Sequence, residues 1–328
     1  MAAFGIGDDS LDAAPPAADA IADGPTFSFE LYPPRNDAAA AALQVSLGPL
    51  VAAGPEFISV TYGANGSSRG VSLDVLRHLL RNTDVKPMAH LTCVGSSYAE
   101  ASRLIREFLD AGVTSFLALR GDPPAGVEEG DVFLGDLRSA GELVQLIHRV
   151  QAERVPFVQV PIPGFPGARR LASGEKVTIA VAAFPNGHPR SRSIEQDLDT
   201  LLAKEAAGAN LAISQLFFEA DEFLGFVDRA RAAGVTMRIL PGIMPVLSAA
   251  RLHRIVELSG ETLPAMLLRD LEAADDPATV GIEHASRLAA RLLDGGASGL
   301  HLYTFNRHEA PLAVLGAVGL LDPARTPA

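Results

Sequence analysis

Four apolar segments in the first part of the chain run into polar residues or glycine where their apolar character stops. They are FSFE at 27–30, VTYG at 60–63, HLTC at 90–93 and LRGD at 119–122. An apolar run rich in aromatic and β-branched residues is typical of a buried strand. Parallel strands that end together in polar groups form the active-site end of an α/β barrel, so we expect the chemistry at these strand ends.

Strand-like and helix-like segments alternate along the chain after residue 24. The predicted strands are 26–31, 57–61, 86–92, 114–120, 177–183, 210–215, 236–240 and 298–303. The predicted helices are 37–53, 71–82, 97–111, 138–152, 193–207, 220–233, 247–258 and 309–320, with further helical segments up to 294. This alternation predicts a single closed (β/α)8 TIM barrel.

Two parts of the chain do not follow this alternation. Residues 1–24 are rich in Ala, Asp, Gly and Pro without periodicity, so we expect a flexible leader ahead of a barrel domain at 25–328. Prolines and glycines interrupt any regular element between 153 and 176. That segment is either an excursion packed on the barrel or a lid, and the sequence leaves both open.

Composition narrows the partners and the setting. The chain has 328 residues, of which 39 are acidic and 27 basic, and its formal charge of -12 argues against a nucleic-acid partner. Cys93 is the only cysteine, and neither a membrane-spanning run nor a signal peptide is evident, so we expect a cytoplasmic protein. No H-x-H or H-E-x-x-H pair is present, so we expect no metal site. Homo-oligomerisation stays open.

Glu30 is the first candidate for catalysis. It shares one face of its predicted strand with Ser28, and that face either lines the barrel or faces outward. If it lines the barrel, we expect burial to raise the pKa of the Glu30 carboxyl and suit it to donate a proton. The alternative is a structural carboxylate paired with Arg35.

Further polar residues follow other predicted strands. Arg120 and Asp122 flank a glycine and suit an anionic group and a heterocycle, respectively, although an internal salt bridge is the alternative. The other candidates are His188, Asp197 and Lys204 for a polar cofactor group, Gln215 for a pterin-like ligand, and Tyr303, Asn306 and Arg307, with Arg307 suited to a carboxylate. Solvated helix faces and loop hydrogen bonds are their alternative interpretations. An acid with several polar anchors suits a redox cofactor.

The order of these motifs resembles the 5,10-methylenetetrahydrofolate reductase family. The resemblance rests on SFELYPPR, SVTYGAN, HLTC and LRGD, and it continues through 184–188, 215–218, 241–245 and 303–307. It implies a catalytic barrel that holds FAD, is reduced by NADH or NADPH, and passes hydride to methylenetetrahydrofolate in a ping-pong reaction. The chain matches the catalytic region alone.

The resemblance also implies roles for single residues. Glu30 matches the general acid that protonates folate N5, and Asp122 matches an aspartate near the flavin and pterin. The matched flavin-binding positions are Thr61, His90, Arg120, Gly121, Asp122, Phe184, His188, Asp197 and Lys204, and the matched folate contacts are Glu30, Gln215 and Arg307.

The chain departs from the family pattern at four positions. Phe184 stands where some members have Tyr, Thr200 and Ala203 replace an Asn and an Arg, and Ala249 replaces a stacking Phe. The first three departures predict a weaker hold on FAD, and Ala249 predicts a changed stacking surface for the folate or the nicotinamide. The alternatives are direct hydride transfer from the nicotinamide without flavin and, from another class, a non-catalytic folate- or flavin-binding barrel.

Overall fold

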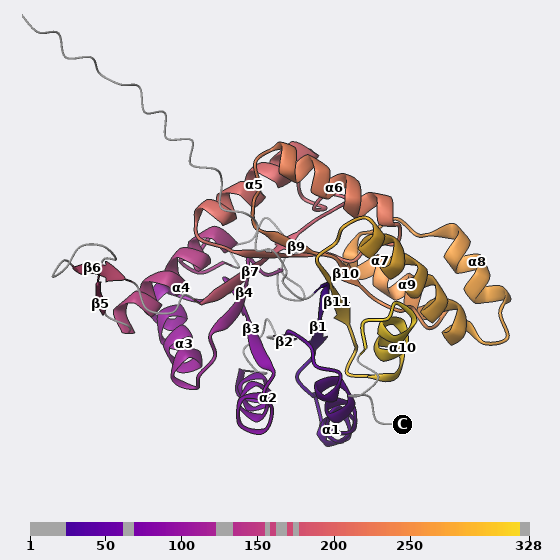
Figure 1. Cartoon of the computed structure of the whole chain (residues 1–328), viewed down its shortest axis with the longest axis horizontal. Helices are drawn as coiled ribbons and strands as arrows, with labels where there is room; N and C mark the ends of the chain where they lie inside the picture. Colours follow the sequence, from indigo (N-terminus) through magenta and orange to yellow (C-terminus); the bar gives the residue numbers. More distant parts are fainter. Residues whose placement is uncertain are drawn as a thin grey trace, which may run out of the picture.

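A barrel of parallel strands forms the centre of the molecule, and helices surround it (Figure 1). The computed structural model describes residues 24–61, 69–122, 134–154, 158–161, 169–172 and 177–321. The predicted leader, apart from Gly24, and the glycine-containing loop at 62–68 lie outside the described residues. None of the helices in the described ranges is long and apolar enough to cross a membrane.

The parallel sheet has nine strands, in the order β10-β11-β1-β2-β3-β4-β7-β8-β9. Their bounds are β1 (Thr26–Leu31), β2 (Phe57–Val60), β3 (Lys86–Thr92), β4 (Ser115–Leu119), β7 (Thr178–Ala183), β8 (Leu211–Ser214), β9 (Arg238–Leu240), β10 (Gly242–Ile243) and β11 (Gly299–Tyr303). The helices are α1 (Asp37–Ala52), α2 (Arg69–Asn82), α3 (Tyr98–Asp110), α4 (Ala140–Arg154), α5 (Ile194–Ala206), α6 (Ala220–Ala232), α7 (Ala249–Ser259), α8 (Ala265–Ala273), α9 (Pro277–Asp294) and α10 (Glu309–Ala317).

Pro241 explains why nine strands occupy the eight positions expected of the barrel. β9 pairs with β8 and β10 pairs with β11, and Pro241 alone separates β9 from β10. Proline has no N–H to donate, but its carbonyl accepts a hydrogen bond from His301 N at 2.9 Å. The seventh predicted strand, 236–240, contains β9 alone, and the unpredicted β10 follows it. Together these two short strands fill one barrel position and pair with opposite neighbours, which confirms the barrel.

Apolar side chains fill both faces of the sheet. The outward faces of the strands pack against the helices in the main core, where Phe29, Phe108 and Phe116 are almost fully buried. A second cluster lies inside the barrel and consists of Phe57, Met88, Leu117, Ala180, Leu211, Ile213 and Leu240. Polar residues inside the barrel therefore stand out against an apolar lining.

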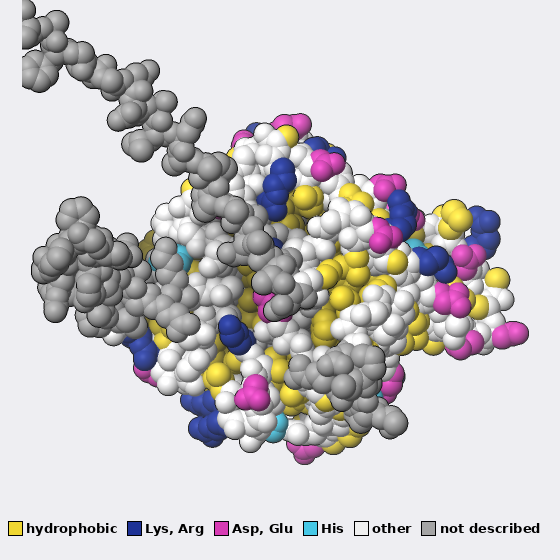
Figure 2. Space-filling view, in the orientation of Figure 1, with side chains coloured by type: hydrophobic (Ala, Val, Ile, Leu, Met, Phe, Trp, Pro, Cys, Tyr) yellow, Lys and Arg dark blue, Asp and Glu magenta, His cyan; other side chains and the backbone are white. Residues whose placement is uncertain are grey.

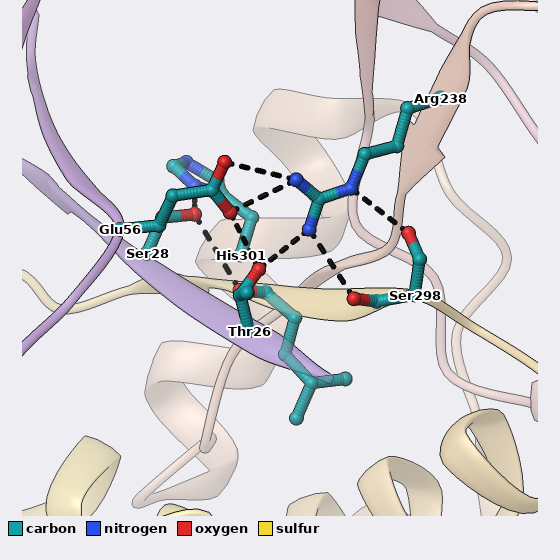
Figure 3. A network of polar contacts seen from close by, with 7 residues as sticks. Thr26, Ser28, Glu56, Arg238, Ser298 and His301 are labelled. Atoms are coloured by element: carbon teal, nitrogen blue, oxygen red, sulfur yellow. Dashed lines mark hydrogen bonds and ion pairs between the residues drawn. The ribbon is translucent and has the colours of Figure 1, made fainter. Parts of the chain in front are cut away.

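Arg238 closes the N-terminal end of the barrel with a dense polar network (Figure 3). Its guanidinium donates to both carboxylate oxygens of Glu56 at 2.9 Å, to the Thr26 hydroxyl, and to Ser298 Oγ at 2.9 Å. These residues begin or precede four different strands. Polar groups at this end of a barrel serve stability.

The segment at 153–176 contains a short antiparallel hairpin of β5 (Val158–Pro161) and β6 (Arg169–Ala172). Figure 1 shows both strands outside the ring, on the side of α4. The described part of this segment is therefore an excursion and does not cover the centre of the barrel.

Candidate active site

Glu30 and two histidines form a buried polar cluster at the C-terminal half of the barrel. Glu30 Oε2 lies 3.6 Å from His90 Nε2 and 3.8 Å from His301 Nε2, and the Glu30 side chain is only 10% exposed. Thr61 donates its hydroxyl to Glu30 Oε1 at 3.4 Å. Of the two orientations left open by the sequence, Glu30 has the one that lines the barrel, whereas Arg35 is exposed and makes no ion pair with it in the described structure.

His301 is a site residue that sequence reasoning missed. It lies opposite Ser28 in the β1–β11 register, and its Nδ1 is 2.8 Å from Ser28 Oγ (Figure 3). Its ring stacks on Phe57 from the apolar lining at a centroid separation of 5.8 Å. The sequence could have indicated His301, because side chains alternate along β11 and His301 therefore lies on the same face as the candidate Tyr303.

Three buried polar atoms of this cluster have no hydrogen-bond partner among the described residues. They are Ser59 Oγ, His90 Nε2 and His301 Nε2. Leaving a buried polar group unpaired costs about 1–3 kcal/mol. Such atoms suit a ligand with its own donors and acceptors. No group of three or more His, Cys, Asp or Glu in the described ranges is arranged to hold a metal ion.

The charge state of Glu30 differs from the one expected from sequence. Burial raises the pKa of the Glu30 carboxyl, but His301, His90 and Thr61 together lower it by more, so its pKa lies below the usual value. The expectation of a net raised pKa is therefore wrong for the ligand-free protein. Burial also lowers the pKa of His90, although the charge of Glu30 opposes this. The prediction considered desolvation and lacked the partners that the fold supplies.

The turn after β11 is fastened to the end of β1. Asn306 accepts a hydrogen bond from Tyr32 N and donates one to Tyr32 O, both at 2.8 Å, and Thr304 Oγ1 donates to Glu30 O at 2.7 Å. Phe305 and Asn306 have φ values of 51° and 59°, in the left-handed region that residues other than glycine rarely adopt. The turn stacks Phe305 on Tyr32 and leaves Arg307 exposed at the rim.

The end of β4 carries the predicted Arg120, Gly121 and Asp122. Gly121 has a φ of 85°, and a Cβ there would lie 2.6 Å from Val94 Cγ2, so both backbone and space require glycine. The Asp122 side chain is 90% exposed and 3.8 Å from Arg190. Asp122 thus lies within ion-pair distance of Arg190, a partner that the sequence did not suggest.

The predicted residues after β7 lie together on one side of the barrel. Phe184 and His188 make an edge-to-face contact at 4.6 Å, and the Lys204 ammonium lies 5.9 Å from the Phe184 ring centroid. Lys204 Nζ donates to Ala182 O at 2.8 Å. Asp197 accepts hydrogen bonds from His188 N at 2.9 Å and from the Ser191 hydroxyl. Asp197 and Lys204 thus share a face of α5, as their spacing predicts.

The remaining predicted positions have local contacts. Gln215 Oε1 accepts a hydrogen bond from Leu216 N at 2.9 Å, and Thr200 donates to Gln196 O on its own helix. Ala203 is exposed on α5, and Ala249 packs against the cluster that includes Tyr303 and Phe305. Binding roles for these positions stay predictions.

Apolar side chains gather near the middle of the face shown in Figure 2, over the region of β10, β11 and α7, while most charged side chains lie nearer the rim. The functional groups at this end are a buried carboxylate, two imidazoles and cationic side chains at the rim. This arrangement can move a proton and can hold an extended, partly aromatic ligand.

The chain is similar to known proteins of one family. The family model of methylenetetrahydrofolate reductase matches residues 17–319. The 5,10-methylenetetrahydrofolate reductase of Escherichia coli is 30% identical over 297 residues, which cover 89% of this chain and 90% of that protein. A probable methylenetetrahydrofolate reductase (NADPH) of Caenorhabditis elegans is 33% identical over 305 residues, and a probable NADH form of rice is 31% identical over 321 residues. The matches cover 42% and 50% of those two longer proteins.

Among solved structures, an uncharacterized protein from Clostridium thermocellum that binds two copies of 5-methyl-5,6,7,8-tetrahydrofolic acid superposes with a TM-score of 0.57. It covers 92% of this chain at 12% sequence identity, which supports the fold alone. The family match covers most of the sequence and supports membership of the family as well as the fold. The chain therefore belongs to the methylenetetrahydrofolate reductase family, whose related members include NADH and NADPH forms.

Proposed function

We propose that this chain reduces 5,10-methylenetetrahydrofolate to 5-methyltetrahydrofolate with NADH or NADPH, with FAD as its bound cofactor and the two substrates using the site in turn. The observation that carries the proposal is the Glu30 carboxylate, buried between His90 and His301 at the strand ends of a barrel of this family. The one-carbon unit stays on N5 in the product, so its bond to N10 must break, and the departing N10, not N5 as expected from the resemblance, takes up a proton. We assign Glu30 as the acid that supplies this proton.

A carboxyl with a lowered pKa is a poor store for a proton, and the two neighbouring histidines explain how Glu30 could still act as an acid. His301 is held by Ser28 through Nδ1, so its Nε2 is oriented toward Glu30 Oε2. A folate ring seated over Glu30 removes the remaining access of water, and this desolvation raises the pKa of the carboxyl. Glu30 then takes up a proton when substrate binds and delivers it to N10 as the bond between N10 and the one-carbon unit breaks, with the imidazoles as neighbouring proton carriers.

The residues present fit a flavin. Ser59 Oγ and His90 Nε2 are buried and unpaired among the described residues, which suits a ring with donors and acceptors along its edge. Lys204 and His188 supply positive or polar groups suited to the phosphates, and Thr61, Arg120, Gly121, Phe184 and Asp197 would complete the contacts. FAD, when bound, accepts hydride from the nicotinamide and gives it to the folate.

A paired substitution tests the role of Glu30. Glu30→Gln keeps the shape of the side chain and removes its proton-donating capacity, so we expect folate reduction to fall by about 10²–10⁴-fold. Oxidation of the nicotinamide by an artificial acceptor should stay near the wild-type rate, because that half needs no proton donor. Glu56→Gln makes the same chemical change in the Arg238 network at the opposite end of the barrel. It should lower stability and leave both rates unchanged. Equal loss of both half-reactions in Glu30→Gln would disprove the assignment.

Direct hydride transfer without flavin is the second candidate function. It is favoured by the α5 surface, where Ala203 is exposed without a cationic side chain and Thr200 bonds to its own helix. An anaerobic assay with NADH or NADPH and methylenetetrahydrofolate, with and without added FAD, separates the two. Full activity in flavin-free protein that FAD does not change supports direct transfer. Folate or flavin binding without turnover would instead indicate a non-catalytic barrel.

A further inference from the structure

Arg251 lies at the outer end of a row of side chains that begins at the proposed proton donor. Its guanidinium carbon is 4.7 Å from the centroid of the Phe305 ring. Phe305 stacks on Tyr32 with a centroid separation of 5.7 Å and an interplanar angle of 29°. The charge of Glu30 in turn helps burial to raise the pKa of the Tyr32 hydroxyl, which shows that these two groups are close. A ligand that covers Glu30 therefore has a stacked aromatic path toward Arg251.

The position of Arg251 is unfavourable for its helix. Ser248 is the N-cap of α7 and accepts a hydrogen bond from Arg251 N at 3.2 Å, so Arg251 lies in the first turn. The N-terminus of a helix carries partial positive charge, which favours acidic residues there and disfavours cations. The first turn of α7 contains no acidic residue. The helix end and the guanidinium thus concentrate positive charge beside β10 and β11 (Figure 1).

The backbone of Phe305 also has a conformation that is locally unfavourable. Its left-handed φ is unfavourable for a bulky residue, and the Asn306 side chain holds the turn against Tyr32 through two hydrogen bonds. An arginine in the first turn of a helix and a bulky residue with a left-handed φ are both locally unfavourable, and here they are in contact. Such local exceptions are typical of a binding site. The described residues place no carboxylate within ion-pair distance of Arg251, whereas Arg254 on the same helix pairs with Glu257 at 2.6 Å.

We infer that Arg251, presented on the Phe305 ring, binds an anionic group at the end of the substrate remote from the reacting ring. This inference rests on the proposed function. Folate is elongated, with the pterin at one end and glutamate carboxylates at the other, and NADPH carries a 2′-phosphate far from its nicotinamide. Arginine suits both groups because its planar guanidinium binds carboxylates and phosphates through two hydrogen bonds. Arg251 is thus a specificity residue for an anionic tail.

Equilibrium binding to the whole chain tests this inference. The ligands are 5-methyltetrahydrofolate, the corresponding 5-methyltetrahydropteroate without glutamate, NADPH and NADH. We expect Arg251→Gln to raise the dissociation constant of one glutamylated or phosphorylated ligand by about tenfold or more, and to leave unchanged that of the counterpart that lacks the glutamate or the 2′-phosphate. A loss confined to methyltetrahydrofolate identifies the carboxylates as the bound group, and a loss confined to NADPH identifies the 2′-phosphate.

Two further variants make the result decisive. Arg254→Gln removes the same charge from the same helix outside the stacked row and should leave all four dissociation constants at wild-type values. Arg251→Lys keeps the charge, so it should recover part of the lost affinity even if Arg251→Gln folds poorly. Equal constants for wild type, Arg251→Gln and Arg251→Lys would overturn the inference while turnover by the wild type leaves the proposed function standing. A wild type that neither binds nor turns over these ligands would overturn both.

Discussion

Lys204 gives a prediction that links protein stability to cofactor binding. Its ammonium is partly buried on α5, and burial lowers its pKa from 10.5 to about 8, against a small opposing effect of Asp197. The folded protein therefore binds the Lys204 proton more weakly than the unfolded chain does. Between pH 8 and 10.5 the unfolded state holds more protons, so the free energy of unfolding rises with pH.

The expected gain follows from these two pKa values. Raising the pH from 7 to 9 should increase the free energy of unfolding by about 1 kcal/mol through Lys204 alone. Lys204→Met has a similar length and no titratable group, so it should lack this gain. Burial raises the pKa of Cys93 to about 12, which lowers stability as the pH approaches the value of the exposed thiol. That contribution is the same in both proteins and cancels in their difference.

Urea denaturation of cofactor-free wild type and Lys204→Met at pH 7, 8 and 9 measures the difference. The same denaturation series in saturating FAD tests the link to cofactor binding, because phosphates beside Lys204 would favour its charged form and restore its pKa. The extra pH dependence of the wild type should then shrink. Parallel stability profiles without cofactor would refute the pKa argument. A difference that persists unchanged with bound FAD would show that the phosphates do not contact Lys204.

Two further substitutions test the strand ends. Gly121→Ala should lower the free energy of unfolding by about 1–3 kcal/mol through its positive φ, and by more through the contact with Val94 Cγ2. Gly95→Ala is the matched control, since Gly95 has a φ of 63° but open space around it, so urea titrations should show a smaller loss. Ala203→Arg should tighten FAD binding about tenfold if α5 faces the cofactor, and an unchanged dissociation constant in fluorescence titration would contradict this.

Much of the fold could be predicted because local signals agreed with one another. β1 and β3 have the predicted bounds, since each is an apolar run that ends abruptly in polar residues or a turn. Glycines with positive φ follow the ends of α3 and α5 at Gly112 and Gly208, where φ is 97° and 110°. The strand β10 after Pro241 was missed, because a run of two residues is too short to show a periodic pattern.

The site was predicted less completely, for a physical reason. Thr61 follows β2 and His90 lies in the second half of β3, and these strands come next to β1 in the barrel. Their motifs therefore predicted that both residues lie at the same end of the barrel as Glu30. His301 lies 271 positions from Glu30 and becomes its neighbour only when β11 pairs with β1. The candidates predicted on this part of the chain were Tyr303 and the residues after it, whereas His301 lies two residues before Tyr303 and is fully buried. The alternation of strands and helices predicts that the barrel closes, but the register that sets His301 opposite Ser28 cannot be predicted from either strand alone.

The two ends of the barrel show how this closure divides stability from chemistry. At the N-terminal end Arg238 satisfies its donors with Glu56, Thr26 and Ser298, so little hydrogen-bonding capacity is left for a ligand. At the other end His90 Nε2 and His301 Nε2 are buried 3.6 and 3.8 Å from Glu30 Oε2 and have no hydrogen-bond partner among the described residues. Buried groups without hydrogen bonds lower stability, and a protein keeps them where a ligand supplies the missing partner. The contrast in hydrogen bonding between the two ends is therefore the physical reason to test the Glu30 end for catalysis and the Arg238 end for stability.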